Sequence, residues 1–433
     1  MMKTSISRLL AMALVVVMLL SMAGCGAKEK APEAKSAKTS INILMEDVPD
    51  TQCVLARLGE FEEKTGIKVN VESVNYSSMH EKILTQMLSA TNAYDVIVVD
   101  CYWVGEFAAA GWMEPLDKYI ADSGFDTSVY VDSMMNMVGK VNDTTYMLPF
   151  YNYMLSLIYR TDVWADPELA AGYKEATGKE LTIPDNMEDY VEACKYITSV
   201  KGSEMAGAVM QGLRPDPIAM EWCNYLFSCG GDFYDEAGNV AINSPNAVKA
   251  LELYVDNMNN AAPNGAPGFG FDEAFNVIAQ GNAASYVTYN WMLPRLENAD
   301  ESSVAGLCDI APMPGGVSLN AGWGWAIPHN AADKDTSWKF LQWVESFDVC
   351  KARAMDGGSP TRVDVMSDPE VLAACPYLDT VQTIMETSKM IPIMEDAPQL
   401  IEILGRELSE AVTGAKTAQA ALDTLAAEMQ KMK

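Results

Sequence analysis

The sequence predicts an α/β protein with more than one domain. Strand-like and helix-like segments alternate between residues 41 and 100, an order typical of a parallel sheet covered by helices. The chain has 433 residues, whereas one domain usually holds about 100–200. We therefore expect two or three compact parts.

Five consecutive segments carry the alternation. Residues 41–45 form an apolar run, residues 67–72 alternate with the period of two of a strand, and residues 96–100 are apolar and β-branched up to a final acid. Residues 54–65 and 79–90 repeat apolar side chains at helical spacing. The pattern predicts strand, helix, strand, helix, strand.

Two acids mark one edge of the predicted sheet. Asp47 follows the first strand closely, and Asp100 ends the third. Ligands of parallel α/β sheets bind beyond the carboxyl ends of the strands, so both side chains are candidates to contact a ligand. Capping of the following helix is the alternative role for each, because Asp is favoured at helix starts.

The rest of the chain continues with short strands and amphipathic helices. The predicted elements are an aromatic turn leading into a strand at 148–159, helices at 185–200, 245–259, 271–280 and 336–346, strands at 284–289 and ending at 326–328, and two closing helices at 398–433 broken near Gly414. Ser244 suits the N-cap of the helix at 245–259.

The N-terminus has the pattern of an export signal. Positively charged residues precede an apolar run of 12 residues at 9–20, which is shorter than the roughly 20 that span a bilayer. The end of this segment, Ser-Met-Ala-Gly-Cys, resembles the lipobox of bacterial lipoproteins, which implies cleavage after residue 24 and a lipid on Cys25. An ordinary signal peptide with an incidental cysteine is the alternative. Residues 25–39 read as a lipidated end and flexible tether, which predicts anchoring to the outer face of the cell membrane.

Composition excludes several function classes. The formal net charge of −29 disfavours nucleic acid as a partner. Two histidines and no CxxC motif disfavour a metal site or a His-dependent triad, and we expect no cofactor. We expect the cysteines after Cys25 to be reduced and packed; they are Cys53, Cys101, Cys194, Cys223, Cys229, Cys308, Cys350 and Cys375.

Several short motifs occur in an order typical of one family. They are Phe-Glu-Glu-Lys-Thr-Gly-Ile-Lys-Val at 61–69, Tyr-Asp-Val-Ile at 94–97, the segment 107–116, Leu-Ser-Leu-Ile-Tyr-Arg at 155–160, Tyr-Asn-Trp at 289–291, Gly-Trp-Gly-Trp-Ala-Ile-Pro at 322–328 and Gly-Ser-Pro-Thr-Arg at 358–362. Together they resemble extracellular solute-binding proteins of the maltose-binding type. The similarity covers roughly residues 40–430.

This resemblance implies a two-lobed, type II periplasmic-binding-protein-like fold, in which each lobe is a sheet flanked by helices and a hinged cleft lies between the lobes. The first lobe would comprise residues 40–148 and 303–345, and the second 149–302 and 346–433. The implied function is capture of a sugar, sugar alcohol or oligosaccharide by a monomeric lipoprotein, for delivery to the permease subunits of an ABC importer.

A sugar site should combine aromatic rings with hydrogen-bonding groups, because sugars present flat C–H faces and a rim of hydroxyls. By the resemblance Trp291 occupies a stacking position and Trp222 lies in an aromatic segment that touches ligand. Trp103 lies just beyond Asp100, and of Trp323 and Trp325 one should face the cleft and the other the interior. Packing in the core is the alternative for each ring, and it is the role we expect of Trp112, Trp164, Trp338 and Trp343.

The polar candidates flank the expected crossovers between lobes. Tyr151, Tyr153 and Asn290 are candidate donors at the rim, and Arg362 stands in the late Ser-Pro-Thr-Arg motif. Arg362 could hold two hydroxyls or form a structural salt bridge. The aromatic residue that the family carries near the start of the closing helices is missing at 398–401, which argues against long-oligosaccharide subsites.

Two other function classes fit part of the pattern. A glycoside hydrolase would also use aromatic platforms and paired carboxylates, although the sequence has no nucleophile elbow, HExxH motif, P-loop or dinucleotide fingerprint. A binding protein for a polyamine, peptide or phosphate ester is the second alternative, and the acidic composition favours the polyamine.

Overall fold

The computed structural model describes residues 39–89 and 92–432. The predicted signal peptide (1–24), the lipidation site Cys25 and the tether up to residue 38 lie outside the described residues. Within the described residues, no helix combines the length and the apolar character needed to cross a bilayer.

A five-stranded sheet organises the first lobe. Its strands run in the order β2 (Lys68–Val74), β1 (Ser40–Glu46), β3 (Val96–Asp100), β10 (Trp323–Ala326) and β6 (Leu148–Tyr151). β1 is parallel to β2 and β3, as the alternating pattern predicts, whereas β10 is antiparallel to both of its neighbours. Every residue of β3 is buried, as expected of a central strand covered on both faces.

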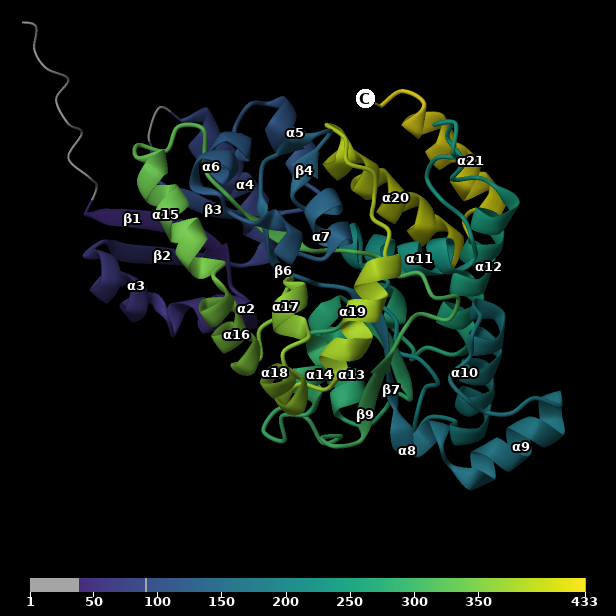
Figure 1. Ribbon diagram of the computed structural model, residues 1–433. Helices are drawn as coiled ribbons and strands as arrows, with labels where there is room; N and C mark the ends of the chain where they lie inside the picture. The colour runs from purple at the N-terminus through teal and green to yellow at the C-terminus, as the bar shows by residue number, and fades with distance from the viewer. Residues whose placement is uncertain (1–38, 90–91, 433) are drawn as a thin grey trace, which may run out of the picture. The chain divides into compact units, whose positions relative to one another are not determined.

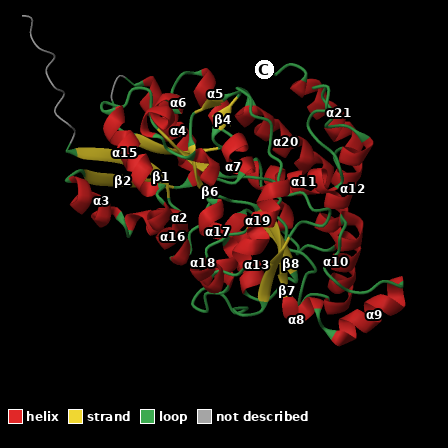
Figure 2. Ribbon diagram, viewed as in Figure 1, coloured by secondary structure: helices red, strands yellow, loops and turns green. Residues whose placement is uncertain are grey.

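Helices cover this sheet (Figures 1 and 2). They are α2 (Pro49–Leu55), α3 (Leu58–Thr65), α4 (Tyr76–Leu88), α5 (Val104–Ala109), α6 (Asp117–Ser123), α7 (Asp132–Met137) and α15 (Lys334–Val344), with a small β4–β5 hairpin (Lys140–Val141 and Thr144–Thr145) and a 3₁₀ turn at Thr127–Val129. The predicted helix at 54–65 is in fact α2 and α3, and Gly66 ends α3 with φ 72°, a conformation that glycine adopts without strain.

A separate three-stranded sheet organises the second lobe (Figure 2). β7 (Leu155–Arg160) lies between β8 (Ser285–Tyr289) and β9 (Cys308–Ala311), and both pairs are antiparallel. The surrounding helices are α8 (Thr161–Trp164), α9 (Pro167–Thr177), α10 (Met187–Lys201), α11 (Asp216–Ser228), α12 (Pro245–Asn260), α13 (Phe271–Ala279), α14 (Met292–Leu296), α20 (Ala397–Val412) and α21 (Ala418–Met429), with a 3₁₀ turn at Ala266–Gly268. α20 packs on α11 and α12.

The strand pairing differs from two of the predicted lobe boundaries. β6 belongs to the first sheet, so the chain leaves the first lobe after Tyr151 and not at residue 149. β9 falls in the segment 303–345 that was assigned to the first lobe, yet it pairs with β7 of the second sheet. The return crossover therefore lies between β9 and β10.

The later segment 347–387 connects the two lobes. It contains α16 (Phe347–Met355), α17 (Val363–Met366), α18 (Pro369–Ala374) and α19 (Tyr377–Thr387). α16 packs against α2 and α15 of the first lobe, whereas α19 contacts both α7 of the first lobe and β9 of the second.

Candidate ligand-binding cavity

A cavity of about 610 Å³ is lined by residues of both lobes. This volume lies in the range of about 300–1,000 Å³ that holds small molecules. Its lining includes Glu46, Asp47, Tyr76, Asp100, Tyr153, Arg214, Asp216, Met220, Phe271, Asp272, Glu273, Tyr289, Trp291 and Trp323.

The topology of the first sheet explains why so many of them meet. Glu46 and Asp100 end the parallel strands β1 and β3, so they lie at the same edge. β10 runs the other way, and its first residue Trp323 pairs with Asp100. Thus one sheet edge presents carboxyl groups and an indole ring to the cavity.

Aromatic side chains form the wall on the first lobe. The rings of Tyr76 and Trp323 line the cavity, with their centroids 5.9 Å apart. Trp103 does not line the cavity; it packs behind both, 5.6 Å from Tyr76 and 5.3 Å from Trp323. Trp103 therefore supports the wall instead of facing a ligand.

A second aromatic group faces the cavity from the other lobe. Trp291 follows the end of β8, and its ring lies 5.5 Å from that of Tyr153 in the first crossover. Tyr289 lies 6.0 Å from Tyr153 and 5.4 Å from Phe271 at the start of α13. The indole N–H of Trp291 has no hydrogen-bond partner among the described residues.

The carboxyl groups at the sheet edge are strongly affected by burial. Burial, with a smaller contribution from Asp100 and other nearby acids, raises the pKa of Glu46 to about 8 even though the Tyr151 hydroxyl donates to it at 2.8 Å. Burial likewise raises the pKa of Asp100 to about 7. The backbone N–H of Tyr102, which donates to this carboxylate at 3.1 Å, lowers the pKa by less than burial raises it. Perturbed carboxyl groups in a cavity indicate a functional site.

The two lobes also touch across the cavity. The hydroxyl of Tyr76, on α4, donates to Asp216 at the start of α11 at 3.4 Å. Gly105 of α5 lies so close to Met394, which precedes α20, that a Cβ atom on Gly105 would be 2.5 Å from the Met394 carbonyl oxygen. Tyr76 and Asp216 line the cavity, whereas Gly105 and Met394 lie outside its lining.

The structure places five of the eleven predicted ligand residues in the cavity lining: Asp47, Asp100, Tyr153, Trp291 and Trp323. Tyr153 also donates its hydroxyl to Asp50 of α2, at 3.1 Å. Neither Asp47 nor Asp100 caps a helix with its side chain: α2 has Val48 and α5 has Trp103 at the N-cap, and no cap hydrogen bond from a side chain is present at either.

Two predicted tryptophans point into the protein core instead. Trp222 is fully buried; it lies two positions from Met220 on α11, about 200° around the helix, and Met220 is the residue that faces the cavity. Trp325 lies further along β10, where its indole N–H donates to Glu345 at 2.9 Å and its ring packs 4.1 Å from Phe150.

Three predicted polar residues have structural partners. Tyr151 holds Glu46. Asn290 fixes the first crossover by accepting the Met154 N–H at 3.0 Å and donating to the side chain of Asn152 at 2.9 Å. Arg362 forms a salt bridge with Asp364 and donates to the Glu345 carbonyl at 2.7 Å.

Several lining residues were not predicted from the sequence. Glu46 ends β1, and Tyr76 lies two residues beyond the end of β2, at the start of α4. Searching the end of every strand and the residues just after it would find both. Asp216, Phe271 and Tyr289 come from the second lobe, and only Tyr289 had a signal, its position beside the motif containing Trp291.

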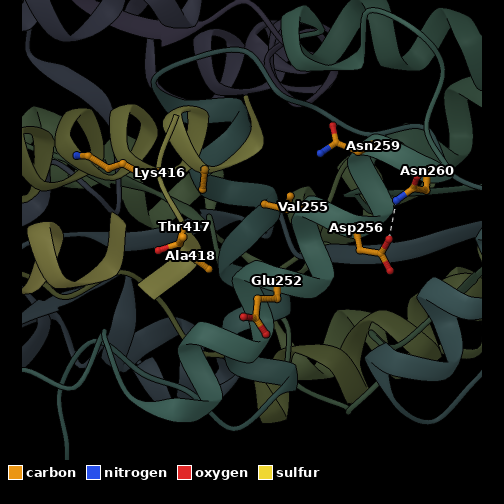
Figure 3. Close-up of a pocket in the computed structure, with 9 residues that line it drawn as sticks. Glu252, Val255, Asp256, Asn259, Asn260, Lys416, Thr417 and Ala418 are labelled. Atoms are coloured by element: carbon orange, nitrogen blue, oxygen red, sulfur yellow. Dashed lines mark hydrogen bonds between the residues drawn. The ribbon is translucent and has the colours of Figure 1, made fainter. Parts of the chain in front are cut away.

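A second, smaller hollow of about 350 Å³ lies between α12 and the turn from α20 to α21 (Figure 3). Two of its three charged side chains, Lys416 and Asp256, are already paired. Lys416 contacts Glu410 at 2.8 Å, and Asp256 contacts Lys195 at 2.8 Å and Asn260 at 2.6 Å. It lacks aromatic side chains, so it does not compete as a ligand site.

In the part of the chain that the structure describes, no group of three or more His, Cys, Asp or Glu side chains is arranged to hold a metal ion. All eight described cysteines are free, and five are buried. The functional groups that line the cavity are therefore mainly aromatic rings and carboxyl groups, with the guanidinium of Arg214.

Known proteins with the same organisation bind solutes. The model of the bacterial extracellular solute-binding protein family matches residues 40–347. The erythritol/L-threitol-binding protein of Mycolicibacterium smegmatis is 23% identical over 412 residues, covering 87% of this chain and 85% of that protein. A probable amino-acid ABC transporter periplasmic-binding protein of Sinorhizobium fredii is 22% identical over 376 residues, covering 86% and 84% of the two chains.

A solved structure supports the same assignment. The ABC transporter solute-binding protein of Agrobacterium radiobacter K84, in complex with ribitol, superimposes with a TM-score of 0.79 at 26% identity, covering 91% of this chain and 98% of that one. The family consists of binding proteins and not of enzymes, which removes the glycoside hydrolase alternative. The fold, the cavity between two lobes and the match over residues 40–347 show that this chain belongs to the bacterial extracellular solute-binding protein family.

Proposed function

We propose that this protein captures a sugar, a sugar alcohol or a small oligosaccharide in the cavity between its lobes and delivers it to an ABC importer. The observation that carries this proposal is the pairing of aromatic walls on both lobes, Trp323 with Tyr76 and Trp291 with Tyr289, around a rim of carboxyl groups. Rings accommodate C–H faces, and carboxylates accept hydroxyls. Relatives named for erythritol or solved with ribitol support the same ligand class.

An amino acid is the ligand class that another relative's name suggests. Its α-carboxylate would need a free cation. Among the described residues, Arg214 is the only basic residue that lines the cavity, and its guanidinium lies 3.6 Å from Glu402. The acidic lining therefore favours a polyhydroxylated ligand over an amino acid.

The N-terminal pattern completes the proposal. A lipid on Cys25 and a tether over residues 25–39 would keep the protein at the outer face of the cell membrane, near the permease subunits that receive its ligand. Mass spectrometry of the protein from the membrane fraction tests this step: a mature chain that starts at a lipid-modified Cys25 supports it, and an unmodified Cys25 contradicts it.

A thermal-shift panel tests the proposed ligand class. Residues 38–433 form one compact unit, so the chain from Lys38 onward is screened against tetritols, pentitols, hexitols, hexoses, maltose, amino acids and polyamines. A ligand that binds only the folded state raises the melting temperature by mass action. Stabilisation by a polyol or sugar supports the proposal, and stabilisation by amino acids alone contradicts it.

A further inference from the structure

The cavity lining has an unbalanced charge. Glu46, Asp47, Asp100, Asp216, Asp272 and Glu273 contribute six carboxyl groups, against the single guanidinium of Arg214. That guanidinium lies 3.6 Å from Glu402, which is not part of the lining. Asp47, Asp272 and Glu273 are exposed, whereas Glu46 and Asp100 are buried and Asp216 is half-buried, and these last three form no ion pair among the described residues.

Burial makes the ionised forms of the deepest acids unfavourable. Glu46 is 9% exposed and Asp100 is 2% exposed. Their hydrogen-bond partners are neutral donors: the Tyr151 hydroxyl for Glu46, and the Tyr102 N–H with the Cys101 and Tyr76 side chains for Asp100. Within the described residues neither carboxyl group forms an ion pair. Asp216 is likewise held by the hydroxyl of Tyr76. A buried carboxylate without a cation is unfavourable, and burial raises the pKa of all three groups.

The charge of a ligand decides whether binding relieves or increases this cost. A neutral ligand displaces the remaining water from the carboxyl groups without supplying a counter-charge, so it favours their protonated forms. An ammonium group favours the ionised forms instead. The ring faces of Trp323, Tyr76 and Trp291 border the same cavity, and aromatic faces attract cations as well as C–H groups.

We propose that the preferred ligand is a polyhydroxylated molecule that carries a protonated amine, such as an amino sugar or an amino polyol. This inference rests on the proposed function and refines it. The hydroxyls and C–H faces of such a ligand suit the aromatic walls, and its ammonium group suits the acids at the ends of β1 and β3. A polyamine without hydroxyls would satisfy the acids alone.

Calorimetric titration with matched ligand sets at pH 7 tests the inference. One set is sorbitol, 1-amino-1-deoxysorbitol and gluconate; another is glucose, glucosamine and glucuronate; spermidine represents a cation without hydroxyls. We expect the amine of a set to bind at least about tenfold more tightly than its neutral counterpart, and the acid to bind most weakly. Buffers of different ionisation enthalpy add a second readout, because amine binding should release protons whereas neutral ligands should take them up.

The outcomes separate this inference from the proposed function. If the neutral compound binds as tightly as the amine, the inference is wrong and the proposed function stands. If spermidine binds most tightly and the hydroxylated compounds do not bind, both are wrong. If no sugar, polyol or amino derivative binds in a panel extended to tetritols, pentitols and disaccharides, the proposed function fails and the inference fails with it.

Charge-neutral substitutions test which carboxyl groups bind the ammonium group of the ligand. Glu46→Gln and Asp100→Asn keep the side-chain shapes and should reduce the tenfold preference for the amine to about twofold or less. Glu63→Gln, on the exposed face of α3, is the matched control and should leave the preference unchanged. If one variant does not fold, the other carries the test; an unchanged preference in a folded variant of either residue overturns the assignment of the ammonium group to this sheet edge.

Discussion

Two indole rings define opposite walls of the cavity at the scale of single residues. Trp323 is 3% exposed and is held between Asp100 and Trp103. Trp291 is half-buried, lies beside Tyr153, and precedes the short helix α14. Because Trp291 is less enclosed, removing its ring should disturb the ligand more than the fold.

Trp291→Ala is therefore expected to weaken ligand binding at least about tenfold, equivalent to about 1.4 kcal/mol, while unfolding stays cooperative. Calorimetric titration and a thermal melt without ligand measure the two effects. Trp343→Ala is the control, because Trp343 packs on Phe61 of α3 away from the cavity and should lower the melting temperature without changing affinity. Loss of folding in Trp291→Ala would assign this residue to the core.

The pKa of Glu46 predicts a pH-dependent stability. Its folded pKa of about 8 lies above the value of 4.5 for an exposed glutamate, so the contribution of this group to stability is complete below pH 4.5 and is lost as the pH rises towards 8. We expect the free energy of unfolding of the ligand-free protein to fall between pH 5 and pH 8, and Glu46→Gln to flatten this slope. Urea denaturation across this range measures it; an equally steep slope in Glu46→Gln contradicts the assignment.

Three of the predicted residues that line the cavity share one property. Asp47, Asp100 and Trp323 lie at the ends of strands, where chain order alone indicates which sheet edge they occupy. Asp216 could not be found in this way, because it reaches the cavity from another lobe and its role depends on how close α11 lies to Tyr76. Trp222 is buried and does not line the cavity, and the sequence did not show this because an aromatic residue on a helix does not reveal which face is buried.

At the scale of elements, α5 and the segment before α20 approach each other closely. Gly105 is in a helix and needs no unusual backbone conformation, yet a Cβ atom there would lie 2.5 Å from Met394 O and 2.8 Å from Met394 C and N. A side chain at this position would push the second lobe away from α5. The small residue thus permits this close contact between the two lobes.

Gly105→Val is expected to leave each lobe folded and to lower ligand affinity at least about tenfold, although residue 105 does not line the cavity. Gly59→Ala on α3 is the matched control, since a Cβ there meets no atom within 4 Å and Ala favours the helix. Calorimetric titration and small-angle X-ray scattering of the liganded variants measure affinity and lobe closure. Unchanged affinity in Gly105→Val would show that this contact does not matter for binding.

A buried ion pair joins α15, α16 and β10 beneath the crossovers. Glu345 accepts from Arg353 at 3.0 Å and from the Trp325 indole at 2.9 Å, and both charged side chains are almost inaccessible. Glu345→Ala would leave Arg353 buried without its closest carboxylate, so we expect a loss of about 3–5 kcal/mol in the free energy of unfolding. Asp122→Ala, which removes an exposed partner of Lys118 on α6, should change stability little. Equal effects of the two substitutions in urea denaturation would contradict this account.

At the scale of the whole molecule, chain order predicted the local elements better than the lobe boundaries. The parallel arrangement of β1, β2 and β3 followed from the strand–helix alternation. The sheet to which β9 belongs was not predicted. It depends on hydrogen bonding to β7, which the residue types at 308–311 do not reveal. The sequence therefore predicted that the chain crosses between two lobes, but the structure was needed to locate the crossovers.

The central claim is that a polyhydroxylated ligand lies between the two lobes, in contact with aromatic rings of both. A crystal structure with the tightest-binding compound of the panel tests this most directly. We expect the ligand between Trp323 with Tyr76 on one lobe and Trp291 with Tyr289 on the other, within hydrogen-bond distance of the Glu46 or Asp100 carboxyl group. A ligand bound elsewhere on the protein, with this cavity containing only water, would contradict the account.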